Sequence, residues 1–319
     1  MKLAFSTLGC PDFSWSDIYS MAKDFGFDGI EMRGLGNDIF SVRAQPFRAD
    51  QIDKTIANLK RMRLEIPCLS TGCVLKDADC WQQTKAEIEE YIRLAEKLGA
   101  KYIRLLGDRN ADIEGEVDDE VVLAALKDIV PYAEERGVIL LVETNGVYSD
   151  TARLRDLLAR VESDNVAALW DMHHPYRFAN EKPETTIQNL GVYIKHIHIK
   201  DSVMVDGKVK YKIMGEGDMP IESMIRALRS VNYEGYISLE WVKNTAPELQ
   251  SAGIVFPHFA NYMEQFMGSD RSNHRLQDNA RKTGKYVWPK NQLIDLTFPQ
   301  VLDRMVEEFP DQYAFKYTT

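Results

Sequence analysis

The hydrophobic and polar positions of this chain form two alternating kinds of segment. Short apolar runs, typical of buried strands, are followed by longer stretches with an apolar residue every three or four positions, typical of amphipathic helices. The pattern predicts strands at 2–6, 29–32, 65–70, 101–106, 138–143, 166–171, 193–200 and 236–240. It predicts helices at 15–24, 49–63 (with Asp50 as a cap), 81–98, 118–135, 150–161, 183–190, 221–231 and 247–267. Each predicted strand is therefore followed by a predicted helix.

This strict alternation indicates a parallel sheet, and eight repeats indicate closure into a (β/α)₈ barrel. A doubly wound open sheet is the competing α/β architecture, but it normally carries a glycine-rich phosphate turn after its first strand. Here that turn reads Ser6-Thr7-Leu8-Gly9-Cys10-Pro11, which is not such a motif. We therefore expect an α/β TIM barrel over residues 1–267, with a C-terminal extension.

The composition changes after the last predicted helix. Residues 269–290 are polar and locally basic, which is typical of a linker or of a strap over the barrel. Residues 298–309 then show a short amphipathic pattern, with Leu302, Met305, Val306 and Phe309 on one side. We expect residues 268–319 to form a polar linker followed by a short helical extension.

Composition and charge narrow the function classes. The chain has 319 residues, of which 45% are hydrophobic and 28% charged, and its formal net charge of −10 argues against broad binding of nucleic acid. No apolar run approaches the roughly 18 residues that cross a membrane. The four cysteines fit neither a zinc spacing nor a disulfide framework. We expect a cytoplasmic protein with reduced thiols that acts on a small molecule, without nucleic acid or membrane partners.

The segment 195–201, Lys-His-Ile-His-Ile-Lys-Asp, carries the strongest chemical signal. Because strand side chains alternate between faces, His196, His198 and Lys200 point one way and the two isoleucines point the other. Two imidazoles and an ammonium are unusual on the inner face of a strand. We therefore interpret it as a barrel strand whose inward-facing polar side chains contribute to a functional site at the end of the strand.

Three other predicted strands also end in an acidic residue. Together the four strand ends offer Glu143, Asp171, His198 and Glu240. A single carboxylate at a strand end is an ordinary helix cap or surface group, but four such ends converge at the rim where barrel active sites lie. Three carboxylates and one imidazole are a hard, oxygen-rich set for one divalent metal. Mn²⁺ is the expected ion, and Mg²⁺, Co²⁺ and Zn²⁺ are compatible with the set.

These residues carry a family resemblance over roughly residues 1–267. The chain resembles the xylose isomerase-like TIM barrels, and within them the sugar phosphate isomerase/epimerase group, which includes ketose 3-epimerases, hydroxypyruvate isomerases and inosose dehydratases. The resemblance rests on four motifs: Asp171-Met172-His173-His174, His198-Ile199-Lys200-Asp201, Gly215-Glu216-Gly217-Asp218 and Ser238-Leu239-Glu240-Trp241. The motifs are specific for the superfamily and uninformative about the substrate.

The resemblance implies a role for each matching residue. Glu143, Asp171, His198 and Glu240 would bind the metal, and the two glutamates would also act as an acid/base pair across the substrate. One glutamate would remove a proton beside a carbonyl to give a metal-bound cis-enediolate, and the other would return it. His174 matches a substrate-contacting histidine of the family, whereas His173 reads as structural.

The sequence also departs from the ketose 3-epimerase pattern. Met204 stands where those enzymes have an arginine, and Asn145 stands where the family often has histidine. Lys200 is a candidate replacement for the missing substrate contact. These two departures leave the substrate open.

Three further residues are candidates for binding substrate. Arg104, inside a predicted strand, and Arg33, just after one, can meet a phosphate or carboxylate. The alternative for either arginine is a structural ion pair with Glu31 or Asp108. Trp241 is expected to form a wall of the pocket, with a plain core role as its alternative.

We therefore expect an isomerase or epimerase of a sugar, sugar phosphate or related hydroxy-carbonyl compound. The same site in a dehydratase would expel a β-hydroxyl from a cyclic polyol ketone or a dehydroshikimate-like substrate. A DNA-repair endonuclease of the superfamily would need many more than the six histidines present. A non-catalytic barrel module is the remaining alternative.

Two expectations concern association. Residues 293–319 resemble the opening of an AMP-binding, acyl-CoA synthetase-like enzyme, which implies a fused or lost adenylate-forming domain. The alternative is an ordinary C-terminal helix that packs on the barrel or on a neighbouring subunit. On the last barrel helix, Val255, Phe256, Phe259 and Tyr262 can pack a homodimer or seal the barrel.

Overall fold

The computed structural model describes residues 1–36, 38, 40–113, 115–267, 299–300 and 303. Residues Met1–Phe266 form one compact unit. The linker, the helix and the resemblance to an adenylate-forming enzyme predicted beyond residue 267 lie outside the described residues, apart from 299–300 and 303. Among the described helices, none combines the length and hydropathy that a membrane crossing requires.

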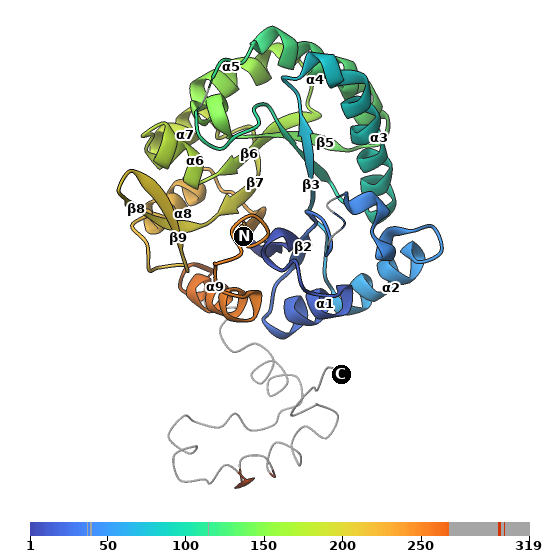
Figure 1. Ribbon diagram of the computed structural model, residues 1–319, viewed down its shortest axis with the longest axis vertical. Helices are drawn as coiled ribbons and strands as arrows, with labels where there is room; N and C mark the ends of the chain where they lie inside the picture. Colours follow the sequence, from blue (N-terminus) through green and yellow to red (C-terminus); the bar gives the residue numbers. More distant parts are fainter. Residues whose placement is uncertain (37, 39, 114, 268–298, 301–302, 304–319) are drawn as a thin grey trace. The chain divides into compact units, whose positions relative to one another are not determined.

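Eight parallel strands form one sheet in the order β2-β1-β10-β7-β6-β5-β4-β3. Isolated parallel bridges from Gly29 to Glu65 and from Met32 to Leu69 join the two edge strands, so the sheet curves into a nearly closed barrel. Figure 1 shows the helices around the outside of these strands. The strands are β1 Lys2–Ser6, β2 Gly29–Glu31, β3 Cys68–Val74, β4 Tyr102–Leu106, β5 Ile139–Glu143, β6 Val166–Asp171, β7 Ile194–Ile199 and β10 Tyr236–Leu239.

The helices follow the strands as the periodicity predicts, with one addition. They are α1 Trp15–Asp24, α2 Ile52–Met62, α3 Trp81–Leu98, α4 Asp119–Glu135, α5 Thr151–Val161, α6 His173–Phe178, α7 Pro183–Leu190, α8 Ile221–Ser230 and α9 Ala252–Met267. The short α6, directly after β6, was not predicted. Side chains cap the first turn of predicted helices. Ser14 caps α1 in a capping box with Asp17, and Asp150 caps α5.

Three predicted boundaries are wrong. The cap of α2 is Gln51, and Asp50 accepts a hydrogen bond from the side chain of Gln51 at 3.0 Å instead of capping the helix. β3 begins at Cys68 instead of residue 65, because Pro67 has no N–H to donate to a neighbouring strand. The last helix begins at Ala252 rather than at 247.

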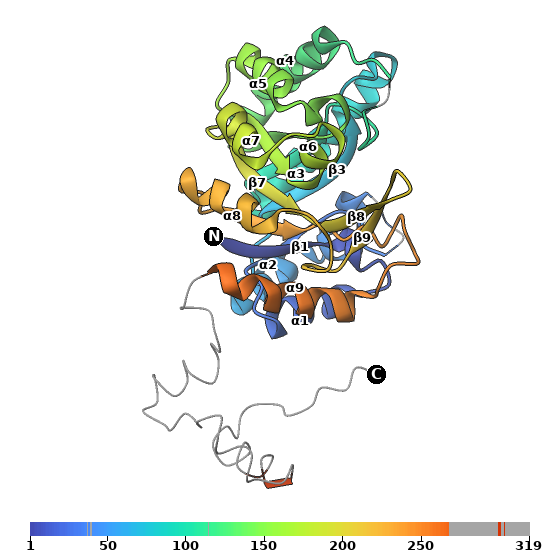
Figure 2. The ribbon, with the colours of Figure 1, turned by 90° about the vertical axis from the view of Figure 1, so that its left-hand side faces the viewer.

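The segment after β7 is an antiparallel hairpin, for which no strands were predicted from the sequence. It consists of β8 Asp201–Val205 and β9 Lys208–Lys212. Asp206 and Gly207, with φ of 50° and 73°, make the tight turn between them. In Figure 2 the N-terminus and the hairpin lie at opposite ends of the barrel, so the hairpin stands at the carboxyl ends of the strands.

The inner face of the barrel changes from apolar to charged along the strands. Leu141, Ala167 and Leu169 form a buried cluster inside the barrel. Glu143 and Asp171 follow two positions further along the same strands, so they share the inward direction. On α9, Val255, Phe256 and Phe259 are buried, and the ring of Phe256 stacks on Phe5 at 4.2 Å between centroids. These α9 side chains therefore seal the barrel.

Candidate metal centre

Four residues singled out from the sequence converge at the carboxyl ends of the barrel strands. Glu143 ends β5, Asp171 ends β6, His198 lies near the end of β7, and Glu240 directly follows β10. Each offers one ligand atom, and these atoms all lie within 4.8 Å of one another. All four residues are buried. The strand register therefore produces one compact cluster from residues far apart in the sequence.

The imidazole of His198 faces the three carboxylates. Its Nδ1 atom lies 3.3 Å from Glu143 Oε1, 3.4 Å from Glu240 Oε1 and 3.9 Å from Asp171 Oδ2. The position of Asp171 is fixed separately, because its Oδ1 accepts a hydrogen bond from the backbone N–H of His173 at 2.8 Å. One nitrogen and three carboxylate oxygens thus surround one small space.

Glu31, at the end of β2, orients His198 from the other side. Its Oε1 lies 2.8 Å from His198 Nε2, its Oε2 lies 2.8 Å from His196 Nε2, and Ser70 Oγ donates a hydrogen bond to it. An imidazole held at Nε2 by a carboxylate presents Nδ1 to a metal in a fixed orientation. From the sequence, Glu31 was expected only as an ion-pair partner for an arginine. The missed signal was that β2 also ends in a carboxylate.

Two cations balance the buried carboxylates. Lys200 Nζ pairs with Asp171 and lies 2.5 Å from Glu240 Oε2. Arg104 Nε lies 3.1 Å from Glu143 Oε2, and its Nη1 donates to the carbonyl oxygen of Thr71 at 2.9 Å. Lys200 and Arg104 therefore touch the cluster itself.

The alternative partners proposed for Arg104 are wrong. Asp108 instead pairs with Lys76, with 2.5 Å between Nζ and Oδ1. The carboxylate of Glu31 instead lies 2.8 Å from His196 Nε2 and 2.8 Å from His198 Nε2. Arg104 is directed to Glu143 because β4 and β5 are neighbours in register, with Arg104 opposite Leu141 and Glu143 two residues further along.

The charges in the cluster determine its protonation. Burial raises the pKa of Glu143, but Arg104 and His198 outweigh it and lower the value to about 2. Burial also raises the pKa of Glu240, but the charges of Lys200 and His198 outweigh burial and hold that pKa well below its ordinary value. Burial lowers the pKa of His198, yet the Glu31 and Glu240 carboxylates raise it well above its ordinary value. The carboxylates of Glu143 and Glu240 are therefore ionised at neutral pH, stabilised by the cationic side chains beside them.

The donor set fits a divalent cation. Three carboxylates and one imidazole nitrogen match the ligands that Mn²⁺, Mg²⁺, Co²⁺ and Zn²⁺ take in proteins. Buried carboxylates this close together repel one another unless positive charge separates them. A divalent ion held by Glu143, Asp171, His198 and Glu240 would supply that charge.

The other predicted site residues lie at different distances from the cluster. His174 is adjacent to it, with Nε2 3.5 Å from Asp171 Oδ2 and Nδ1 3.0 Å from the carbonyl oxygen of Thr144. His173 turns away, and its Nε2 lies 2.9 Å from Ser202 Oγ. Trp241 is buried, and its Nε1 donates to the carbonyl oxygen of Gln250 at 2.9 Å. His174 is thus the histidine of this pair that can reach a ligand at the cluster.

Asp201, next to Lys200, holds a neighbouring loop in place. Its carboxylate accepts hydrogen bonds from the backbone N–H groups of Gly215 and Gly217, each at 2.9 Å. A Cβ at Gly217 would overlap this carboxylate, so only glycine fits there. Asp201 therefore anchors the Gly-Glu-Gly-Asp motif at residues 215–218 beneath the hairpin.

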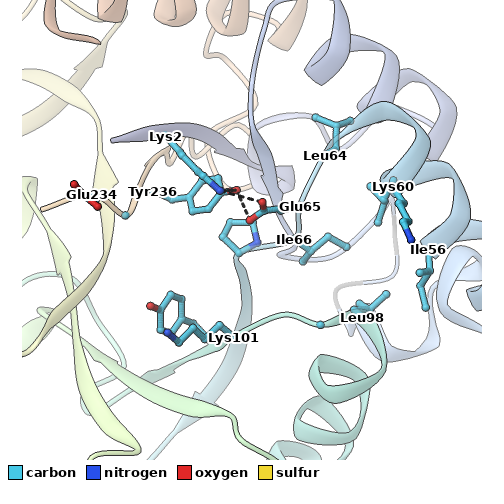
Figure 3. A pocket seen from close by; sticks show the side chains of 15 residues that line it. Lys2, Ile56, Lys60, Leu64, Glu65, Ile66, Leu98, Lys101, Glu234 and Tyr236 are labelled. Carbon is cyan, nitrogen blue, oxygen red and sulfur yellow. Dashed lines mark hydrogen bonds and ion pairs between the residues drawn. The ribbon is translucent and has the colours of Figure 1, made fainter. Parts of the chain in front are cut away.

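A separate cavity of about 480 Å³ lies at the amino ends of the strands. Figure 3 shows Glu65 bonded to Lys2 and to Tyr236, which stand at the starts of β1 and β10. Glu65 lies 3.0 Å from Lys2 Nζ and accepts from the Tyr236 hydroxyl at 2.7 Å. This cavity is at the opposite end of the barrel from the carboxylate cluster.

Comparison with known proteins agrees with this geometry. The chain matches the xylose isomerase-like TIM barrel family over residues 20–256, and it belongs to that family. The fold and the resemblance predicted from the sequence are both confirmed.

Among individual relatives, the chain is 26% identical over 258 residues to a fructoselysine 3-epimerase of Shigella flexneri, covering 76% of this chain and 90% of the relative. Its fold is similar to that of the probable 3-DHS dehydratase AsbF of Bacillus anthracis, with a TM-score of 0.67, 20% identity and coverage of 83% and 99%. It is equally similar to a crystal structure of the IOLI protein with a bound zinc atom, with a TM-score of 0.67, 16% identity and coverage of 83% and 97%.

Proposed function

We propose that this chain is a divalent-metal-dependent epimerase or isomerase of a hydroxy-carbonyl compound such as a sugar or sugar phosphate. One observation carries the proposal. Glu143 and Glu240 lie 3.3 Å and 3.4 Å from the same His198 nitrogen, so the two carboxylates border one small space at the carboxyl ends of the strands. Such a pair can deliver and remove a proton at one substrate held between them.

The metal is expected to be Mn²⁺, held by Glu143, Asp171, His198 and Glu240. When bound, it would polarise the substrate carbonyl and acidify the neighbouring C–H bond. The buried zone around the ligands excludes bulk water, which strengthens every charge interaction within it.

The two glutamates perform the proton transfer. One carboxylate takes the proton from the carbon beside the carbonyl, and the other returns a proton. Return to the opposite face of the same carbon gives epimerisation, and return to the neighbouring carbon gives isomerisation. Arg104 and Lys200 keep Glu143 and Glu240 ionised before the reaction, which is the form that accepts a proton. His174 is positioned beside Asp171 to bind a substrate oxygen.

Relatedness to a fructoselysine 3-epimerase supports an epimerase over a non-catalytic module. A dehydratase would use the same proton abstraction and then expel a hydroxyl group from the next carbon. The two outcomes differ in product, because dehydration creates a conjugated enone with ultraviolet absorbance and epimerisation does not.

The test is solvent exchange. Metal-loaded protein is incubated in deuterated water with a panel of ketoses and ketose phosphates, and deuterium at the carbon beside the carbonyl is measured by NMR. We expect exchange with at least one ketose, reduced at least about 100-fold in Glu143→Gln and in Glu240→Gln. Glu216→Gln, at an exposed glutamate, is the matched control and should keep full activity.

Two results would contradict the proposal. If the metal-loaded protein catalyses no deuterium exchange in any compound of the panel, the proposal that it is an epimerase or isomerase is contradicted. Full exchange in both glutamine variants would show that Glu143 and Glu240 are not the acid/base pair. An enone product would assign the site to the dehydratase alternative.

A further inference from the structure

A second group of metal-ligating side chains lies inside the barrel. Glu31 of β2, Cys68 of β3 and His196 of β7 each offer one ligand atom, and these atoms all lie within 4.8 Å of one another. We call these three residues the seam site. It shares no residue with the candidate metal centre, and His196 precedes His198 by two positions on the inner face of β7. The seam site therefore lies one layer nearer the amino ends of the strands.

The seam site lies where the barrel is closed least completely. β2 and β3 are the two edge strands of the sheet, and in the described structure isolated bridges join them instead of a continuous ladder. Cys68 belongs to this junction, because its carbonyl oxygen accepts a hydrogen bond from the backbone N–H of Met32 at 3.2 Å. β7 stands in the middle of the sheet order. An ion at the seam site would therefore link both edge strands to the far side of the barrel.

The imidazole of His196 is available as a ligand. Its Nε2 lies 2.8 Å from Glu31 Oε2, and its Nδ1 is buried without a hydrogen-bond partner among the described residues. In the tautomer that donates from Nε2 to Glu31, Nδ1 holds an unused lone pair. A buried nitrogen without a partner is costly, and a metal-bound imidazole commonly keeps a carboxylate on its other nitrogen.

Cys68 decides which metal the seam site favours. Burial and the Glu31 carboxylate raise the pKa of its thiol, so the thiol is protonated when no cation is present. A divalent ion reverses this effect, because a coordinating thiol gives up its proton to solvent and binds as the thiolate. A thiolate with an imidazole suits Zn²⁺, whereas Mn²⁺ and Mg²⁺ prefer oxygen ligands. The two sites therefore differ in metal preference.

A thiol, an imidazole and a carboxylate can also form a nucleophilic catalytic triad. Such a triad needs an opening through which an organic substrate reaches the sulfur. Glu31, Cys68 and His196 are all fully buried. A single ion requires far less space than a substrate, so the burial favours metal binding over catalysis.

The cavity at the amino ends of the strands offers a route for the ion. Tyr102 lines that cavity and is half-buried. It is also the direct partner of Cys68 in the register between β3 and β4, and its ring lies 6.5 Å from the His196 ring between centroids. Tyr102 therefore borders the cavity and the seam site at once, and a rotation of its ring would admit an ion.

We propose that Glu31, Cys68 and His196 bind a structural Zn²⁺ ion that holds the two edge strands of the barrel together. This ion is separate from the one expected at the carboxyl ends of the strands. The inference is independent of the proposed reaction.

The first test measures metal content and the spectrum of the cobalt-substituted full chain. After loading with Zn²⁺ and desalting, the wild type should hold about one more ion per chain than Cys68→Ser. After loading with Co²⁺, the wild type should show the near-ultraviolet charge-transfer band of a sulfur–cobalt bond, and Cys68→Ser should lack it. Cys73→Ser, at another buried thiol of β3, is the matched control, and Cys80→Ser removes the exposed thiol.

The second test measures thermal stability. The rise in melting temperature that Zn²⁺ produces, relative to the same protein in a chelator, should be larger in the wild type and Cys73→Ser than in Cys68→Ser and His196→Gln. Cys68→Ala replaces Cys68→Ser if the serine variant does not melt cooperatively. The Cys68-dependent ion should persist in Glu240→Gln, so loss of this site is distinguishable from loss of the candidate metal centre.

Three results would overturn the inference. The first is equal Zn²⁺ content in the wild type and Cys68→Ser. The second is a cobalt spectrum of the wild type without the sulfur band. The third is a band that persists in Cys68→Ser and disappears in Cys80→Ser, because it assigns the ion to the exposed thiol.

Discussion

Replacing Glu31 with glutamine tests how His198 is held in place. Glu31 accepts from His196 Nε2 and His198 Nε2, each at 2.8 Å, and from Ser70 Oγ. Glutamine keeps the size of the side chain but has only one accepting oxygen, so one imidazole loses its partner. Loss of an outer carboxylate of this kind weakens metal binding about 10- to 100-fold, or roughly 1.4–2.8 kcal/mol. We expect this loss of affinity for Mn²⁺ in Glu31→Gln.

The assay is competition between the protein and a chelator of known affinity at constant pH. Ser70→Ala is the matched variant, because it removes one hydrogen bond to Glu31 and leaves both imidazole contacts in place. We expect Ser70→Ala to lose clearly less affinity than Glu31→Gln, because a hydrogen bond to a charged carboxylate contributes roughly 1.5–3 kcal/mol and only part of it acts through His198. Affinity within twofold of the wild type in Glu31→Gln would refute the argument that Glu31 orients His198.

Two further predictions concern the stability of variants. Lys200→Met removes the ammonium between Asp171 and Glu240, so the metal-free protein should lose about 3–5 kcal/mol of unfolding free energy and gain a larger thermal shift from Mn²⁺. A smaller shift than in the wild type would contradict this. Gly217→Ala places a carbon against Asp201 and should cost at least about 2 kcal/mol, whereas Gly253→Ala, with open space around the added carbon, should cost none. Denaturant titrations that rank the two alanine variants equally would count against it.

The pH prediction for metal-free protein belongs with these. Because folding lowers the pKa of Glu143 from 4.5 to about 2, its stabilisation is present above pH 4.5 and is lost as pH falls towards 2. Its upper limit is about 3 kcal/mol. Between pH 7 and pH 3, Glu143→Gln should therefore lose less unfolding free energy than the wild type. Denaturant titrations that give the two proteins parallel curves of unfolding free energy against pH would contradict this.

The barrel and the position of the cluster could be predicted because they depend on local periodicity. Alternation along β5 and β6 fixes which side of the strand Glu143 and Asp171 occupy, and parallel strands bring their carboxyl ends to one rim. The same reasoning applied to Gly29–Glu31 would have placed Glu31 on the inner face of the barrel, next to His198. It was overlooked because β2 has only three residues and shows little alternation.

Other features depend on contacts that no local pattern specifies. The partner of Arg104 follows from the register between β4 and β5, which the sequence alone does not give. The hairpin, in contrast, was predictable, because Asp206-Gly207 between two alternating runs is a strong turn signal.

The central claim is that Glu143, Asp171, His198 and Glu240 form one metal site, and metal content tests it most directly. Purified wild-type chain and Glu240→Gln are loaded with Mn²⁺, desalted and analysed by mass spectrometry for bound metal, with Glu216→Gln as control. The account predicts about one divalent ion per chain in the wild type and the control, and a sharp loss in Glu240→Gln. Wild-type chain that holds no metal and gains no thermal stability from Mn²⁺, Mg²⁺, Co²⁺ or Zn²⁺ would contradict it.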